Sequence, residues 1–356
     1  MNKFVSALEK RVNESIHNNF GIENYDEDRF GKYIPETQIK RVHTEDVKKF
    51  KGNLKKIIKK IIRYQPGKTF GIHSVELVKK YEDRLNCVYE LVNPVSQKLL
   101  VDIVAYRILG YKKIKLPLNN SEYRGHFNEV KLLMNENDTI DPKFMHFILR
   151  RFNLNPLGYN IDLYFTEAGV VTDFIIEQYA YKLNDRHIVN AEPGDVVLDI
   201  GGCWGDTALY FAHKVGENGE VFSFEFIPNN IKIHKLNTGL NTSLEKRIHL
   251  VENPVSEIAG QTIYYIDKGP GSFVYDKPFE NQTGSATSIS VDDFVNKKNI
   301  SKVDFIKMDI EGSEPMALKG AINTIKKFRP KLAISIYHSM DDFVNIPLWL
   351  NSIDVG

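Results

Sequence analysis

The sequence has 356 residues, of which 42% are hydrophobic and 26% charged, a composition typical of a globular protein of about two domains. Its 47 basic and 46 acidic residues nearly cancel, which argues against a chain generally adapted to nucleic acid. The two cysteines, Cys87 and Cys203, cannot form the disulfide framework of a small secreted protein. The first residues also lack the apolar core of a signal peptide, so we expect a cytoplasmic location.

Residues 1–155 are expected to form a mainly helical region. Residues 1–150 contain 28 basic and 19 acidic residues, whereas residues 151–356 contain 19 and 27. The basic excess is densest in residues 48–63, where 8 of 16 residues are Lys or Arg. Apolar residues recur there at helical spacing, which predicts an amphipathic helix over residues 47–63. Such a helix fits either contact with an anionic membrane at its inner face or packing on its own domain with a solvated lysine face.

Beyond about residue 160, short apolar runs alternate with helical stretches. The predicted strands are residues 196–200, 221–226, 249–252, 303–308 and 331–337, and the predicted helices are residues 206–214, a segment from residue 228, 313–327 and 341–351. This βαβα alternation predicts an α/β fold in which residues 156–356 form a doubly wound, mostly parallel, Rossmann-like sheet. In such sheets ligands bind outside the carboxyl ends of the strands.

The first predicted strand ends at Asp199 and runs into a turn that contains Gly201, Gly202 and Gly205. Glycines let the backbone turn tightly and approach a ligand closely. A carboxylate facing this turn would repel a pyrophosphate, which prefers bare N–H groups at a helix N-terminus. It would instead attract the ammonium and sulfonium groups of S-adenosylmethionine. Cys203 has no cationic neighbour in the sequence and is expected to be a packing residue.

Acidic and amide residues follow three further strands. Glu225 ends the second strand, 26 residues after Asp199, where an acid accepts both ribose hydroxyls of a nucleoside. Asn253 follows the third strand, where an adenine edge would lie. The fourth strand runs into Asp309 and Glu311. Of these two acids, Asp309 is expected to face the reacting methyl group and Glu311 to anchor the loop.

Together these stretches resemble the FkbM family of S-adenosylmethionine-dependent methyltransferases, over about residues 158–352. The resemblance rests on residues 196–206 (VVLDIGGCWGD), 224–225 (FE), 237–241, 288–292, 304–314 (DFIKMDIEGSE) and 331–338 (KLAISIYH). It implies O-methylation of a hydroxyl, often on a sugar of a glycan or a secondary metabolite. Phe226 stands where many relatives place proline. The predicted cofactor-binding residues are Asp199, Gly201, Gly202, Gly205, Thr207, Glu225, Phe226, Asn253 and Asp309.

Methyl transfer to a hydroxyl requires alignment, exclusion of water and removal of a proton. His338, after the fifth strand, is the predicted general base, Asp309 is the second candidate, and Glu311 completes the predicted catalytic group. The same three side chains would also suit a divalent cation, although their spacing is not a dedicated metal motif. The metal ligands are therefore left unassigned.

A non-enzymatic alternative is a catalytically impaired accessory protein that binds the cofactor or a glycan. Methylation of a DNA base is not expected, because residues 308–311 read Met-Asp-Ile-Glu and residues 151–356 carry a net charge of −8. We expect residues 1–150 to bind the acceptor or to localise the enzyme.

The end of the sequence carries a further expectation. The last predicted helix extends to about Ser352, so only residues 353–356 follow it. These are too few for the antiparallel strand pair that completes a methyltransferase sheet of this class. We therefore expect this pair to be missing and residues 331–337 to form an exposed edge strand.

Overall fold

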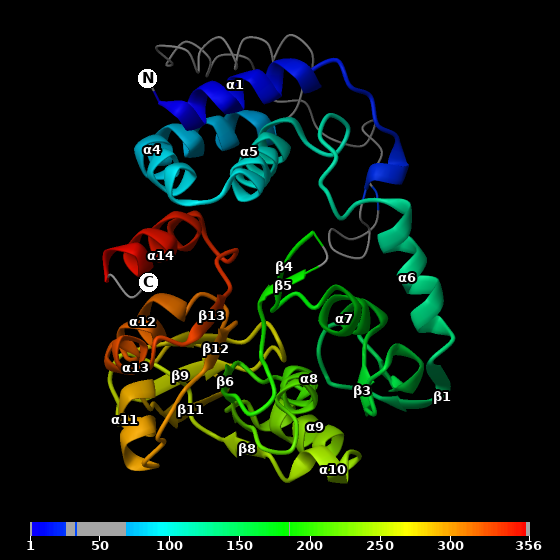
Figure 1. Cartoon of the computed structure of the whole chain (residues 1–356), viewed down its shortest axis with the longest axis vertical. Coiled ribbons are helices and arrows are strands. Elements are labelled where there is room, and N and C mark those ends of the chain that lie inside the picture. Colours follow the sequence, from blue (N-terminus) through cyan, green and yellow to red (C-terminus); the bar gives the residue numbers. More distant parts are fainter. Residues whose placement is uncertain (1, 26–32, 34–68, 185, 354–356) are drawn as a thin grey trace. The chain divides into compact units, whose positions relative to one another are not determined.

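The computed structural model describes residues 2–25, 33, 69–184 and 186–353 (Figure 1). The amphipathic helix predicted over residues 47–63 lies outside these residues. No helix in the described part of the chain is long and apolar enough to cross a membrane. The chain divides into two compact units, Met1–Gly125 with Pro347–Trp349 and His126–Ile346 with Leu350–Gly356.

Helices dominate the described part of the first unit. Asn2 and Asn93 cap two of them, because their side chains accept hydrogen bonds from the N–H groups of Val5 at 2.9 Å and Ser96 at 3.0 Å. Apolar side chains such as Phe4 are completely buried between them. The predicted helical character is confirmed for these residues. The elements are α1 (Lys3–Ser15), η1 (Ile22–Asn24), α4 (Thr69–Leu91), α5 (Pro94–Leu109) and α6 (Ser121–Lys131), which ends in the second unit.

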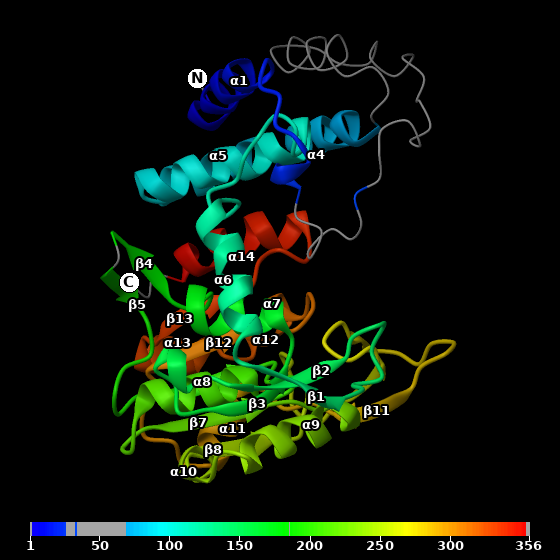
Figure 2. The same cartoon turned by 90° about the vertical axis from the view of Figure 1, so that its right-hand side faces the viewer.

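A small antiparallel sheet opens the second unit. Its strands lie in the order β1-β2-β3, which places β3 at an edge beside α9 (Figure 2). Short elements connect it to the main sheet. The bounds are β1 (Met134–Ile140), β2 (Leu149–Asn153), η4 (Asn155–Leu157), β3 (Asp162–Phe165), α7 (Glu167–Val170), η5 (Val171–Ile176), β4 (Tyr181–Leu183) and β5 (Arg186–Val189).

Two asparagine side chains fasten the edge of β3 to the rest of this unit. The Asn237 amide accepts from the N–H of Tyr164 at 2.7 Å and donates to its carbonyl at 3.0 Å. Asn241 makes the same pair of bonds with Asp162, at 2.9 and 2.6 Å. The amides thus satisfy backbone groups that would otherwise need a neighbouring strand. This attachment explains why the second unit begins at His126, earlier than the boundary near residue 155 expected from the sequence.

The central sheet has five parallel strands in the order β13-β12-β6-β7-β8, which confirms the predicted fold class. Every residue of β6 is buried, as expected for a strand covered on both faces. Figure 1 shows α8 and α9 on one side of the sheet and α11, α12 and α13 on the other. The bounds are β6 (Val196–Ile200), α8 (Asp206–Val215), β7 (Glu220–Phe224), α9 (Pro228–Gly239), α10 (Thr242–Glu245), β8 (Ile248–Val251), α11 (Val291–Lys297), β12 (Phe305–Met308), α12 (Glu314–Lys319), α13 (Ile322–Phe328), β13 (Lys331–Ile334) and α14 (Met340–Ser352).

Two elements differ from the prediction in ways that affect the site. The helix predicted over residues 313–327 is divided near Gly320, where a Cβ atom would lie 2.3 Å from the carbonyl oxygen of Ser256. Strand β13 ends at Ile334, so Tyr337 and His338 follow it in a loop. Within the described residues, no strand pairs with the outer edge of β13.

An antiparallel insertion between β8 and α11 was not predicted. It has the strand order β10-β9-β11 and the bounds β9 (Thr262–Ile266), β10 (Phe273–Tyr275) and β11 (Gly284–Thr287). Residues 269–271 read Gly-Pro-Gly, a turn signal that interrupts the apolar pattern between β9 and β10. The loop between these two strands contributes one wall of the pocket described next.

Candidate functional site

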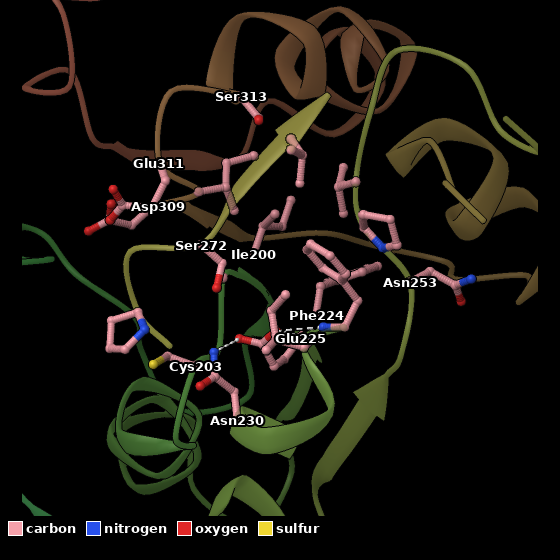
Figure 3. Close-up of a pocket in the computed structure, with 18 of the residues that line it drawn as sticks. Ile200, Cys203, Phe224, Glu225, Asn230, Asn253, Ser272, Asp309, Glu311 and Ser313 are labelled. Carbon is pink, nitrogen blue, oxygen red and sulfur yellow. Dashed lines mark hydrogen bonds between the residues drawn. The ribbon is translucent and has the colours of Figure 1, made fainter. Parts of the chain in front are cut away.

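A pocket opens at the carboxyl ends of β6, β7 and β12, where the strand order reverses on either side of β6. Parallel sheets bind ligands at such a switch point. The pocket holds about 600 Å³, including space open to solvent. Figure 3 shows Asp309 and Glu311 on one side and Glu225 with Asn230 on another. Its lining consists of Ile200, Gly201, Cys203, Phe224, Glu225, Phe226, Ile227, Asn230, Asn253, Pro254, Val255, Gly269, Pro270, Ser272, Val274, Asp309, Ile310, Glu311 and Ser313.

The turn after β6 requires glycine for two reasons. Gly201 has a φ of +92°, and a Cβ atom there would lie 2.0 Å from the backbone oxygen of Asp309. A Cβ atom at Gly202 would lie 2.0 Å from the Ser223 Oγ. Both N–H groups donate to the carbonyl of Phe224, at 3.1 and 2.9 Å. The turn is therefore pressed against β7 and β12, and it forms the floor of the pocket.

Asp199 lies beneath this turn and does not line the pocket. It is completely buried and accepts hydrogen bonds from Thr207 Oγ1 at 2.9 Å and Ser223 Oγ at 2.9 Å. Its Oδ1 lies 3.2 Å from the buried Lys307 ammonium. Burial lowers the pKa of Lys307, but the charges of Asp199, Asp309 and Asp206, together with the hydrogen bond to Asp199, raise it overall. Because Lys307 neutralises Asp199, this pair orders the turn and cannot supply the attraction for a sulfonium that we expected from Asp199.

Glu225 follows β7 and faces the pocket. Its Oε1 accepts from the N–H groups of Phe226 at 2.6 Å and Ile227 at 2.7 Å, and its Oε2 accepts from Asn230 Nδ2 at 3.1 Å. Burial raises the pKa of Glu225 to about 7, although these hydrogen bonds act to lower it. A carboxylate has about four acceptor positions, so Oε2 retains capacity for a ligand hydroxyl.

Asn230 is a pocket residue that the sequence analysis missed. It is buried, and its Oδ1 has no hydrogen-bond partner among the described residues.

Asn253 lines the pocket as expected, but its Nδ2 donates to the carbonyl of Thr287 at 3.0 Å. Phe226 packs edge-on against Tyr265, at 5.4 Å between ring centroids. Burial raises the pKa of the Cys203 thiol well above its usual value, which agrees with the expected packing role.

The other side of the pocket is built around Asp309. Tyr179 donates to its Oδ2 at 2.9 Å, and Tyr337 donates to its Oδ1 at 3.1 Å. His338 Nε2 lies 3.2 Å from Asp309 Oδ1 and 3.2 Å from Glu314 Oε1. Burial opposes ionisation of Asp309, but the hydrogen bond from His338 and the charge of Lys307 hold its pKa below the usual value. The loop after β13 thus places Tyr337 and His338 beside Asp309, which follows β12.

His338 is surrounded by acids, which changes the role that it can have. Its Nδ1 lies 3.7 Å from Glu311 Oε2, in addition to the contacts with Asp309 and Glu314. Burial lowers the pKa of His338, but these three carboxylates raise it to about 10. An imidazole that is already protonated at neutral pH accepts no further proton. This arrangement therefore does not favour the predicted role of His338 as a general base.

Of the predicted site residues, Gly201, Glu225, Phe226, Asn253, Asp309 and Glu311 line the pocket, whereas Asp199, Gly202, Gly205, Thr207 and His338 are not among its lining residues. Tyr179, Tyr337 and Glu314 were not singled out. Glu314 stands five residues after Asp309, at the start of a helix. This spacing was the only sequence signal that could have identified Glu314 as a site residue.

Three carboxylates line the pocket, and among the described residues no lysine or arginine does so. A parallel sheet of this order, with a glycine turn after one strand and an acid after the next, defines a Rossmann-like domain. Residues 189–354 match the family model for the Methyltransferase FkbM domain. This part of the chain is therefore an FkbM methyltransferase domain, which confirms the resemblance found in the sequence.

Two of the solved structures that the chain resembles have low sequence identity to it. The crystal structure of methyltransferase FkbM from Methylobacillus flagellatus KT shares 18% identity at a TM-score of 0.46, over 83% of this chain and 59% of that chain. Fibrillarin from Aeropyrum pernix, in complex with natively bound S-adenosyl-L-methionine, shares 14% identity at a TM-score of 0.23, over 38% of this chain and 42% of that chain. The chain thus spans 59% of the length of the first relative. No curated protein sequence matches it.

Proposed function

We propose that this chain transfers a methyl group from S-adenosylmethionine to a hydroxyl oxygen of a sugar, a glycan or a related metabolite. The observation that carries this proposal is the acidic pocket within the FkbM methyltransferase domain, with Glu225 on one side and Asp309 with Glu311 on another. An acidic lining attracts a cationic cofactor and repels a pyrophosphate. The attraction expected from Asp199 is thus assigned to the three acids that line the pocket.

The polar groups of the pocket favour one orientation of the cofactor. Glu225 Oε2 and the unpartnered Oδ1 of Asn230 would accept hydrogen bonds from the ribose hydroxyls. The apolar side chains of Val255 and Phe226 would pack against adenine. Asp309 and Glu311 would then face the ammonium and sulfonium end, where their negative charges attract both groups.

In the reaction, the bond between the methyl carbon and sulfur breaks while a bond between that carbon and the acceptor oxygen forms. The products are a methyl ether, S-adenosylhomocysteine and one proton. The positive charge on sulfur is lost, so the chemical requirement is alignment and exclusion of water rather than stabilisation of a new charge. Asp309 would accept the hydrogen bond of the acceptor hydroxyl and so aim its oxygen at the methyl group.

The acceptor class rests on the family resemblance rather than on a contact. The part that residues 1–155 play in binding the acceptor or in localisation stays a prediction.

A turnover assay tests the proposed function. The full chain is incubated with S-adenosylmethionine and a panel of sugars, and release of S-adenosylhomocysteine and methylated product is followed by mass spectrometry. We expect release that depends on one class of hydroxylated acceptor and is lost in Asp309→Asn, whereas Glu252→Gln, a change of an exposed acid paired with Lys235, retains it. Binding of S-adenosylmethionine without turnover on any acceptor would instead support the accessory-protein alternative.

A further inference from the structure

Three side chains from separate segments meet beside the pocket. Asp309 follows β12, Glu314 begins α12, and His338 follows β13. One oxygen or nitrogen atom from each lies within 4.8 Å of the others. Only Asp309 of the three also lines the pocket, so the cluster touches the site of methyl transfer through a single shared carboxylate.

The spacing within this cluster matches that of ligands around one small cation. Metal–ligand bonds of about 2.0–2.2 Å place neighbouring ligand atoms about 3.0–3.5 Å apart in octahedral or tetrahedral geometry. His338 Nε2 lies 3.2 Å from Asp309 Oδ1 and 3.2 Å from Glu314 Oε1. These separations require little movement of the three side chains to bind a cation.

A second, independent observation points to a missing partner. Glu314 is completely buried, and its Oε1 accepts from the N–H of Ile310 at 2.7 Å. Its Oε2 has no hydrogen-bond partner among the described residues. A buried carboxylate oxygen without a partner is strongly unfavourable. A cation that the Glu314 carboxylate binds through both of its oxygens would give Oε2 a partner.

The local charge has the same implication. Glu311 Oε2 lies 3.7 Å from His338 Nδ1, so three carboxylates surround one imidazole. Two tyrosine hydroxyls, those of Tyr179 and Tyr337, donate to Asp309 and fix the direction of its carboxylate. Three protein ligands leave coordination positions open for water or substrate, as in catalytic metal sites.

We propose that Asp309, Glu314 and His338 bind one divalent cation, such as Mn²⁺ or Mg²⁺, and that this cation binds the hydroxyl of the methyl acceptor. His338 would release its proton to solvent when its imidazole binds the cation. Carboxylate ligands favour these cations. The second half of the proposal rests on the proposed function. The cation would act as a Lewis acid, so that the bound hydroxyl releases its proton to water before or during methyl transfer. No oxidation or reduction is involved.

The binding half is tested with Mn²⁺ as the probe. The full chain is freed of metals by chelation, and Mn²⁺ is titrated in by calorimetry and by electron paramagnetic resonance. We expect one equivalent to bind, with affinity reduced at least tenfold in both Glu314→Gln and His338→Gln. Glu257→Gln, which changes an acid paired with Lys319 at the surface, should bind as the wild type does. Circular dichroism identifies any variant that fails to fold.

The absence of saturable Mn²⁺ binding in the folded wild type would overturn the site. So would an affinity for Mn²⁺ equal to that of the wild type in the folded Glu314→Gln and His338→Gln variants. The cluster would then consist of a protonated His338 in hydrogen-bond contact with Asp309 and Glu314.

The catalytic half has a separate readout. Chelation should abolish turnover and added Mn²⁺ or Mg²⁺ should restore it, while S-adenosylmethionine binding is unchanged. Full turnover after chelation would overturn the role of the cation in methyl transfer. If Mn²⁺ binds at the cluster but no acceptor is ever methylated, the metal site stands and the proposed function fails.

Discussion

Lys307 and Asp199 form a buried ion pair at the centre of the sheet, with side chains that are 1% and 0% exposed. Lys307 also donates to the carbonyl of Gly201 and lies over the ring of Tyr179, at 5.1 Å from its centroid. The pair thus connects β6 and β12 with the turn that forms the pocket floor. Its contribution to function is to position that turn.

Removing one partner of this pair should be costly. Asp199→Asn removes the carboxylate paired with the buried Lys307 ammonium, so we expect the free energy of unfolding to fall by about 3–5 kcal/mol. Urea unfolding without cofactor measures the loss. In Glu252→Gln the partner Lys235 is exposed, and the loss should stay below about 1 kcal/mol. Equal losses in the two variants would contradict a structural role for the buried pair.

Glu225 makes a pH-dependent contribution to stability. Its folded-state pKa is raised by burial from 4.5 to about 7, so the folded state binds this proton more tightly than the unfolded chain. The contribution of Glu225 to stability therefore falls as pH rises from about 4.5 to about 7. Urea unfolding at about pH 5 and about pH 7.5 should show wild type losing stability relative to Glu225→Gln at the higher pH. A difference between the two proteins that does not change with pH would contradict the raised pKa.

At the scale of elements, the turn between β6 and α8 determines the shape of the pocket. Gly201 and Gly216 flank α8 and both have positive φ, but only Gly201 has atoms within 4 Å of the position of a Cβ atom. Substituting each of the two glycines in turn therefore separates the cost of backbone strain from the cost of steric overlap.

Gly201→Ala should cost about 3 kcal/mol or more of stability, because β12 must shift to admit the methyl group. Gly216→Ala should cost only about 1 kcal/mol, from the positive φ alone. Thermal or urea unfolding compares the two, and similar costs would show that the turn is not tightly packed against Asp309.

The attachment of β3 to α9 is the second element-scale feature. Asn237 is completely buried and also donates to the carbonyl of Trp204 at 2.8 Å. Asn237→Ala removes three hydrogen bonds and leaves both backbone groups of Tyr164 unpaired, so we expect a loss of about 2–4 kcal/mol. Asn296→Ala, at an exposed position of α11, should change stability by less than about 0.5 kcal/mol. Hydrogen exchange at Tyr164 reports the local effect, and unchanged protection in Asn237→Ala would contradict it.

The central sheet could be predicted because its strands are continuous apolar runs between turn signals. Val196–Ile200 is buried throughout, and such a run needs no tertiary information to be found. The β9–β11 insertion alternates buried and exposed residues in short strands, which gives a weaker signal. The same limit explains the error over Asp199, since its partner Lys307 lies 108 residues further along the chain. Likewise, the charge of His338 depends on Glu314, which reaches it only through the fold.

Over the whole molecule, basic residues are in excess in residues 1–150 and acidic residues in residues 151–356. Residues 151–356 carry a net charge of −8, and the pocket within them is lined by Glu225, Asp309 and Glu311. A negative field over an open pocket favours a cationic ligand. We therefore expect this pocket to bind S-adenosylmethionine with its ribose at Glu225.

Calorimetric titration of the full chain with S-adenosylmethionine measures this binding. We predict one site per chain, with binding weakened by about 1–3 kcal/mol, or about 5–150-fold, in Glu225→Gln and unchanged in Glu252→Gln. The conservative change keeps an acceptor for the N–H groups of Phe226 and Ile227, so folding should be preserved. Equal affinity in wild type and Glu225→Gln, or no binding by the folded wild type, would contradict the account.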